Sequence, residues 1–184
     1  MGGETTATLT EAGIEVAEPD RVARLIPYAD ITSVNLRFRP QRSGADSYVC
    51  RVQARGVAAL EIRSVSWRNP IWRQNRADTY RPFLLALHDR IAGRQPPPRF
   101  VAGDPPWSFA LQIALWILPI PVIFVAMHDA DWPTRVMYTL LPIFPLGFVA
   151  LFYWYRRLRP NQPRPYDPRA LPRELLPEIK GITS

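Results

Sequence analysis

The sequence lacks the residues from which disulfide frameworks and zinc sites are built. Its 184 residues include one cysteine, Cys50, and two histidines, His88 and His128. A disulfide framework needs paired cysteines, and a structural zinc site needs about four Cys or His ligands. Both are therefore excluded. The chain must fold on its apolar residues, which make up 47% of the sequence.

Lysine is almost absent, although the chain is basic. One lysine accompanies 22 arginines, a bias typical of GC-rich bacterial coding sequence, and the net charge is +7. The positive excess is divided between residues 1–106 and the residues after 155. Aromatic residues do not alternate with basic ones there, as they do in proteins that bind single strands. We therefore expect no nucleic-acid partner.

Charge itself is scarce in the middle of the chain. Trp107–Met127 and Val136–Tyr155 contain no charged residue, and the three charges between them all lie in the segment His128–Arg135. At about 1.5 Å per residue, each uncharged run is long enough for a hydrocarbon core of about 30 Å. The sequence therefore predicts two transmembrane helices, 107–127 and 136–155, joined by an external loop, 128–135.

Arginines flank this predicted transmembrane helical hairpin. Because positive residues favour the cytoplasmic side, we expect a two-pass protein of the bacterial inner (plasma) membrane with both termini in the cytoplasm. Arginines near an anionic leaflet are attracted to membrane lipids. An alternative is that they only set the orientation during insertion. The candidate membrane-surface contacts are Arg94, Arg99, Arg156, Arg157 and Arg159.

Residues before position 80 alternate between apolar and polar with a period of two, which is typical of half-buried strands. Turn residues such as those of Arg55-Gly56 separate the runs. The predicted strands are Thr6–Leu9, Ile14–Ala17, Val22–Ile26, Ile31–Arg39, Tyr48–Ala54 and Ala59–Val65, and Trp67–Arg76 could hold one more. This count gives six or seven antiparallel strands.

The period then changes to that of an amphipathic helix. Asp78 or Thr79 is the predicted N-cap, Pro82 suits a first turn and Gly93 is the predicted end. The apolar residues at helical spacing are Tyr80, Phe83, Leu84, Leu87 and Ile91. The predicted fold class is therefore α+β: an antiparallel β-sandwich or barrel capped by one C-terminal helix, followed by the transmembrane hairpin.

Two stretches carry a resemblance to a known family. Ile26-Pro27-Tyr28-Ala29-Asp30-Ile31-Thr32-Ser33-Val34 resembles a strand pair of the bacterial pleckstrin-homology-like (PH-like) domain. Tyr80-Arg81-Pro82-Phe83-Leu84-Leu85-Ala86-Leu87-His88-Asp89-Arg90 resembles its final helix. The resemblance covers Thr5–Gly93, about half of the chain. It implies a cytoplasmic PH-like domain over residues 1–93 that serves binding or assembly, without catalytic residues.

Proline-rich segments flank the predicted spans. Residues 94–106 contain five prolines and are predicted to be a semi-rigid linker. Residues 156–184 contain six, which exclude a long helix and predict a cytoplasmic tail. The tail also carries the apolar residues Leu171, Leu175, Leu176 and Ile179, which a disordered segment does not need. We expect it to pack on the N-terminal domain or on a partner.

The sequence shows no constellation that predicts catalysis, a cofactor or a metal. His88 is interpreted as a satisfied helix residue and Cys50 as an inward-facing core residue. The loop residues His128, Asp129 and Asp131 make a poor metal site, because a fourth ligand is missing. A candidate interaction surface consists of Trp67, Arg68, Trp72, Arg73 and Arg76, although two core tryptophans with solvated arginines would give the same pattern.

These observations predict a membrane-anchored, non-enzymatic binding or assembly protein whose cytoplasmic module is PH-like. Its expected partners are membrane lipids and an unknown protein or a second copy of the chain. The alternative is an accessory subunit of a larger inner-membrane complex that docks through the hairpin. A small transporter or an enzyme is disfavoured, because ionisable residues are missing from the predicted spans.

Overall fold

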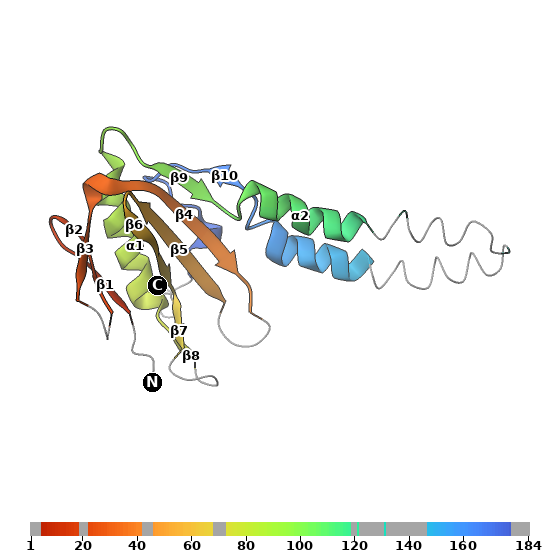
Figure 1. The fold of residues 1–184 in the computed structure, drawn as a ribbon. Helices are drawn as coiled ribbons and strands as arrows, with labels where there is room; N and C mark the ends of the chain where they lie inside the picture. The colour runs from red at the N-terminus through yellow and green to blue at the C-terminus, as the bar shows by residue number, and fades with distance from the viewer. Residues whose placement is uncertain are drawn as a thin grey trace. The chain divides into compact units, whose positions relative to one another are not determined.

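The chain folds into two compact units (Figure 1). The computed structural model describes residues 5–18, 22–41, 46–67, 73–118, 121, 131 and 147–177. Unit 1 comprises Met1–Gly103 and Arg164–Ser184, and unit 2 comprises Asp104–Pro163. Unit 2 is therefore an insertion into the chain of unit 1.

Unit 1 begins with a three-stranded antiparallel sheet, in the order β1-β2-β3. Its strands are β1 (Thr6–Leu9), β2 (Gly13–Ala17) and β3 (Arg24–Pro27). Ile14, Val16 and Ile26 point inward and are almost fully buried. Gly13 lies so close to β3 that a Cβ atom would stand 2.2 Å from the carbonyl oxygen of Ile26, so this position requires glycine.

A five-stranded sheet follows, in the order β10-β9-β4-β5-β6. Its strands are β4 (Ile31–Arg39), β5 (Ser47–Ala54), β6 (Val57–Arg63), β9 (Arg99–Ala102) and β10 (Arg164–Pro165). The 3-10 turn η1 (Tyr28–Asp30) leads into β4. β7 (Val65–Trp67) and β8 (Arg73–Asn75) form a separate pair. All pairs are antiparallel except β4 with β9, which is parallel.

Helix α1 (Ala77–Ala92) supplies the helical part of the core. Four of the predicted apolar residues, Tyr80, Leu84, Leu87 and Ile91, are buried, whereas Phe83 is only half-buried. Ala77 and His88 are buried as well. Gly93 caps its C-terminus as predicted. The predicted N-cap is wrong, because the backbone N–H of Ala77 donates to Oδ1 of Asn75 (3.0 Å) and the helix begins before Asp78. Pro82 lies inside the helix, beyond its first turn.

The apolar core of unit 1 joins both sheets, α1 and the C-terminal segment in one cluster. The last described residues contribute Leu175 and Leu176, which are buried around the 3-10 turn η3 (Arg173–Leu175). Tyr166 and Leu171 pack against the same cluster. The prediction that the tail packs on the N-terminal domain is therefore confirmed, and the apolar residues of the tail explain it.

Unit 2 contains two described helical stretches. α2 (Pro106–Ile117) begins with proline at its first position, where a missing N–H costs nothing. The other stretch, 147–153, continues into a π-helical turn, η2 (Trp154–Leu158). Tyr153 donates from its hydroxyl to Oε1 of Gln112 (3.1 Å), and its ring lies 5.2 Å from that of Trp116. These contacts hold the two stretches together.

The prediction of a transmembrane hairpin is wrong for the described part of this segment. α2 has 12 residues, and no helix in the described ranges is long and apolar enough to cross a membrane. A physical reason lies in Pro119, since helices usually end at or before the residue that precedes a proline. The two-pass inner-membrane assignment is therefore overturned. Residues 119–120, 122–130 and 132–146 of the predicted spans and loop lie outside the described residues.

The predicted PH-like architecture is also corrected. A PH-like sandwich would be antiparallel and would end with its helix, whereas here the chain continues past α1 into β9, which pairs in parallel with β4. The segment predicted as a linker, 94–106, thus contributes a strand to the sheet. What stands is a mixed α+β fold of sheets and short helices.

Unit 1 should fold without unit 2. Ala102 is the register partner of Arg164 in the β9–β10 pair, so the two ends of the insertion already lie side by side. Replacing Asp104–Pro163 by Asn-Gly leaves a three-residue hairpin connection that begins with Gly103. We expect a cooperative thermal transition by far-UV circular dichroism. Loss of that transition would show that the two segments of unit 1 do not form an independent fold.

Candidate binding surfaces and the buried polar cluster

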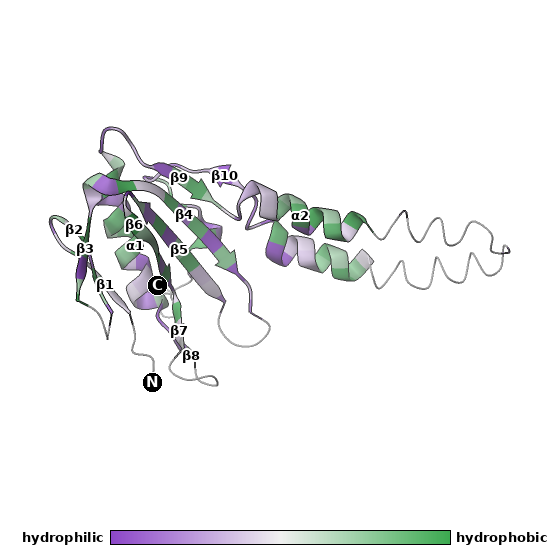
Figure 2. Cartoon of the chain, in the orientation of Figure 1, coloured by the Kyte–Doolittle hydropathy of each residue, from purple (hydrophilic) through white to green (hydrophobic). Residues whose placement is uncertain are grey.

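Unit 2 exposes most of the large apolar side chains that the described surface carries. Figure 2 shows apolar colouring along most of α2 and over part of the second stretch, whose other end is pale to purple. Trp107 is 71% exposed and Phe148 is 72% exposed, values typical of side chains without neighbours. The other exposed large apolar residues of unit 2 are Leu111, Leu115, Ile117, Leu118, Val149, Leu151, Phe152, Trp154 and Tyr155. This set defines the apolar helical surface.

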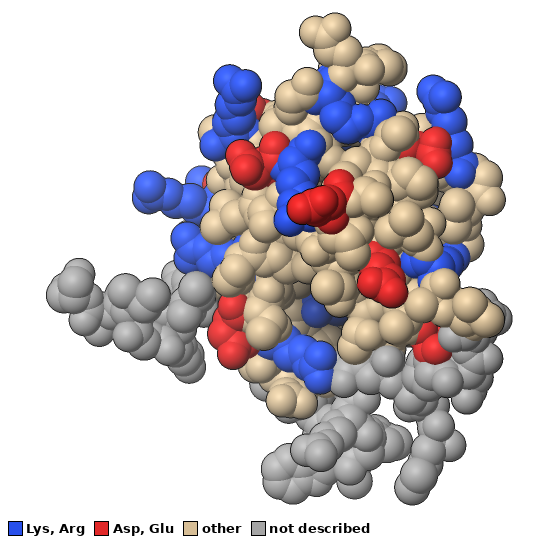
Figure 3. Space-filling view, turned by 90° about the vertical axis from the view of Figure 1, so that its left-hand side faces the viewer, with Lys and Arg blue, Asp and Glu red and all other residues tan. Residues whose placement is uncertain are grey.

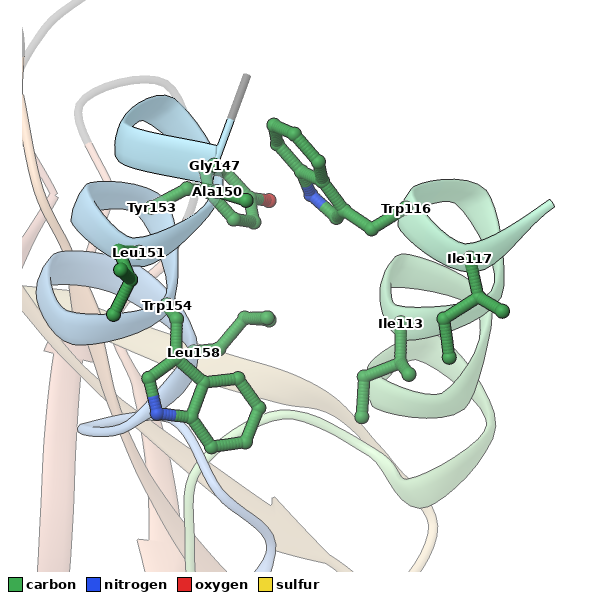
Figure 4. Close-up of a pocket in the computed structure, with 9 residues that line it drawn as sticks. All are labelled: Ile113, Trp116, Ile117, Gly147, Ala150, Leu151, Tyr153, Trp154 and Leu158. Carbon is green, nitrogen blue, oxygen red and sulfur yellow. The ribbon is translucent and has the colours of Figure 1, made fainter. Parts of the chain in front are cut away.

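A groove of about 370 Å³ lies between the two helical stretches of unit 2. Figure 4 shows Trp116 and Trp154 on opposite sides of it. Its lining is apolar and comprises Ile113, Trp116, Ile117, Gly147, Ala150, Leu151, Tyr153, Trp154 and Leu158. The groove therefore extends the apolar helical surface, and the Tyr153 hydroxyl in its lining is engaged with Gln112.

Three of the predicted membrane-surface arginines lie at the C-terminal end of the 147–158 stretch. Each guanidinium lies over an aromatic ring four residues earlier: Arg156 over Phe152 (5.8 Å), Arg157 over Tyr153 (5.9 Å) and Arg159 over Tyr155 (5.4 Å). This spacing of four residues is one helical turn, and the contact is favourable because the ring face is negative. The three cations therefore mark one end of the apolar helical surface.

The other two predicted membrane-surface arginines belong to unit 1. Arg94 donates to the backbone oxygens of Tyr28, Ala29 (2.6 Å) and Ile31 (3.4 Å), so it ties the end of α1 to η1 and β4. Arg99 lies exposed on β9. The five arginines thus fall in different units and make different contacts. Their contact with lipid stays a prediction.

The predicted tryptophan–arginine surface is only partly described. Trp67 and Arg73 are register partners at one end of the β7–β8 pair, and Arg76 donates its backbone N–H to the oxygen of Ser64 (2.8 Å). Arg68 and Trp72 lie outside the described residues, as do the side chains of Trp67 and Arg73. This surface also stays a prediction.

A buried polar cluster joins α1 to the C-terminal segment of unit 1. Nδ1 of His88 lies 2.8 Å from the carbonyl oxygen of Leu84, and Nε2 lies 2.7 Å from the hydroxyl of Tyr166. A carbonyl can only accept, so Nδ1 carries the proton and Nε2 accepts from Tyr166. Phe100 closes the cluster, with its ring 5.6 Å from His88 and 5.7 Å from Tyr166.

Burial perturbs the titration of this cluster. It lowers the pKa of His88 from its ordinary value of 6.5, and the hydrogen bond from the imidazole to Leu84 opposes this only in part. Burial likewise raises the pKa of Tyr166 well above its usual range. Both groups are therefore neutral at pH 7, and each satisfies the other. The interpretation of His88 as a satisfied helix residue is confirmed.

Cys50 lies on the inner face of β5 and is fully buried, as predicted. Burial raises the pKa of its thiol to about 12, so the reactive thiolate is absent at neutral pH. Nearby Tyr80 is almost fully buried, and its hydroxyl has no hydrogen-bond partner among the residues that the structure describes. These are features of core packing rather than of a nucleophile site.

The carboxylates of α1 do not share the buried position of His88, and the described part of the chain holds no metal cluster. Asp78 and Asp89 are exposed on α1, whereas His88 faces the core. Within the described ranges no three His, Cys, Asp or Glu side chains lie close enough together to hold a metal ion. His128 and Asp129 lie outside those ranges.

Comparison of the chain with protein-family models, with curated proteins and with solved structures finds no match. The resemblance to the PH-like family is therefore unsupported by any family model as well as by the strand pairing. The functional evidence is therefore the exposed surface of the chain itself.

Removing the Tyr166 hydroxyl should weaken the attachment of the C-terminal segment. Tyr166→Phe leaves Nε2 of His88 as a buried acceptor without a donor, which costs about 1–3 kcal/mol. Urea denaturation at pH 7.5 measures the change in unfolding free energy. Tyr155→Phe is the control, because that ring is exposed and the change should leave stability unaltered. Equal stability of both variants would contradict a structural role for the His88–Tyr166 hydrogen bond.

Because the pKa of His88 is lowered by folding, the unfolding free energy should decrease as the pH falls below 6.5. Just below pH 6.5, His88 is protonated in the unfolded chain but still neutral in the folded chain. The contribution of this group to unfolding free energy is therefore complete above pH 6.5. It falls as the pH is lowered from 6.5 to the folded pKa. Urea midpoints of wild type and His88→Gln between pH 7.5 and 5 test this, because the glutamine variant should lose less stability.

Proposed function

We propose that the chain is a non-enzymatic binding or assembly protein in which unit 2 is the docking element. The apolar helical surface carries this proposal. Eleven large apolar side chains in unit 2 are exposed, whereas the described part of unit 1 exposes only Val22, Leu25 and Leu85. Contiguous exposed apolar surface in a folded chain marks an interaction site.

The energetic argument favours association. Burying one leucine or phenylalanine side chain contributes about 1.5–3 kcal/mol. Residues of α2 and of 147–155 would together supply many times that amount, enough to offset the entropy lost on association. A partner that covers this surface would therefore bind with a large hydrophobic contribution.

The buried cluster of unit 1 supports a binding role over catalysis. Both ring nitrogens of His88 are occupied by hydrogen bonds, and the Cys50 thiol is buried with a raised pKa. Neither group is free to act on a substrate. In this proposal unit 1 is the folded support, and β9 and β10 attach the docking element to its sheet.

An alternative role is that of an accessory subunit of a larger complex. The insertion of unit 2 between β9 and β10 favours it, because both ends of the docking element are anchored in the same sheet. A permanent subunit should purify with a stoichiometric companion. An assembly protein that acts alone should purify as a homo-oligomer.

The test is the assembly state of the purified full chain. We expect light scattering after size exclusion to show either a homo-oligomer or a stoichiometric complex for the wild type. The double variant Leu115→Glu/Leu151→Glu, at two exposed apolar positions, should be monomeric. Leu85→Glu is the matched control, because Leu85 is exposed on α1 of unit 1 and its change should leave the assembly intact. A monomeric, companion-free wild type would contradict the proposal.

A further inference from the structure

The groove between the two helical stretches of unit 2 is suited to hydrocarbon. Figure 4 shows the side chains of Trp116, Trp154 and Leu158 reaching into it from both stretches. The Tyr153 hydroxyl in its lining already donates to Gln112 (3.1 Å). A polar ligand group buried there would lose its hydration for few partners. The volume of about 370 Å³ is in the range of small-molecule sites. The part of a ligand that enters the groove must therefore be apolar.

A cation stands at one end of this groove. The second stretch rises about 16 Å from Gly147 to Leu158, its first and last residues in the lining. Arg157 immediately precedes Leu158, and its guanidinium lies 5.9 Å from the centre of the Tyr153 ring, which is also part of the lining. Arg157 is exposed, and no carboxylate in the described part of the chain forms an ion pair with it. The groove thus has an apolar end and a cationic end.

Acidic residues do little to offset this cation. Residues 147–163 include three arginines and no acidic residue. Asp104, which precedes α2, accepts from the side-chain amide of Gln112 instead (3.1 Å). The face of the molecule shown in Figure 3 differs, because basic and acidic side chains mix on it. A guanidinium presents a planar fork of donors that matches a carboxylate in two hydrogen bonds. The cationic end of the groove therefore favours a carboxylate.

An apolar groove with a cation at one end fits an amphiphile that has a hydrocarbon chain and an anionic head. We propose that the groove binds a free fatty acid, with its chain between Trp116 and Trp154 and its carboxylate paired with Arg157. The chain replaces water against the apolar lining, which is favourable for each methylene that is buried. The carboxylate stays at the exposed end of the groove, where the ion pair forms without the cost of burying either charge.

This inference goes beyond the proposed function. A docking partner would cover outward side chains such as Trp107 and Phe148, which are exposed and do not line the groove. The fatty acid would occupy the space between the two stretches and leave those side chains exposed. Assembly without fatty-acid binding would contradict this inference alone. Fatty-acid binding by a monomeric, companion-free chain would contradict the proposed function alone.

The experiment titrates the full chain with dansylaminoundecanoic acid, a fluorescent fatty acid, below the concentration at which it forms micelles. We expect saturable binding that dodecanoate displaces. Gly147→Leu should weaken binding at least tenfold, because a Cβ atom at Gly147 meets no atom within 4 Å and the new side chain takes up space in the groove. Gly93→Leu is the matched control, since Gly93 lies in unit 1 and is equally unobstructed. It should change the affinity less than twofold.

A second pair of variants tests the cation. Arg157→Gln should weaken dodecanoate binding about three- to fivefold, the contribution of a good exposed ion pair, and should leave binding of dodecanol unchanged. Arg159→Gln is the matched control, because it removes the same charge from a guanidinium that lies over Tyr155, a residue outside the lining. Dodecyltrimethylammonium should bind the wild type more weakly than dodecanoate. Circular dichroism spectra check that all variants fold.

Three outcomes would overturn the inference. Equal affinities of Gly147→Leu and Gly93→Leu would show that the groove is not the site. Equal losses in Arg157→Gln and Arg159→Gln would show that Arg157 does not pair with the carboxylate. Sedimentation of the chain with phosphatidylglycerol vesicles, together with no displacement of the probe by dodecanoate, would show that the ligand is a bilayer lipid rather than a free fatty acid.

Discussion

The pairing of β9 with its two neighbours is the constraint on which the rest of the structure depends. On one side, β9 pairs in parallel with β4, which places Phe100 and Ala102 in the core. On the other side it pairs with β10, which returns the chain to unit 1 after the sixty residues of unit 2. The segment after β10 then reaches α1, where Tyr166 donates to His88. Without this strand, the tail would lose its place in the core and unit 2 would lose both anchors.

Local patterns in the sequence predicted the local elements well. β1 and β4 have the predicted bounds, and β2, β3, β5 and β6 differ by at most two residues at either end. The helical spacing of Leu84, Leu87 and Ile91 likewise predicted the buried face of α1. β9 could not be predicted, because its four residues follow three consecutive prolines and their pattern is too short to show a period. Its parallel partner lies more than sixty residues earlier, and such pairings leave no local signal.

The uncharged run from Trp107 onward led to the wrong expectation for a related reason. Run length measures how far a helix could extend, not where it ends. α2 ends at Ile117, two residues before Pro119, which restricts the backbone of the residue that precedes it. Absence of charge did predict the apolar character of unit 2, since Trp107, Leu115 and Leu151 are exposed. The composition of this segment was therefore informative about its apolar character, whereas the length of the uncharged run did not give the length of α2.

Sites were harder to predict than elements, because neighbours in space come from different strands. Arg39, Arg51, Arg63 and Arg99 lie on four different strands, and only the register of β4, β5, β6 and β9 brings them to the same side of one sheet. The period-two pattern did show a charged outer side for single strands. It could not show that Arg39 of β4 and Arg63 of β6 share one acid, Glu61. Charged and apolar surfaces also act at different ranges. Attraction between charges reaches about 10 Å at 0.1 M salt, whereas apolar burial acts only on contact. Charges on a partner would therefore act before contact, and apolar docking would then determine how long the complex lasts.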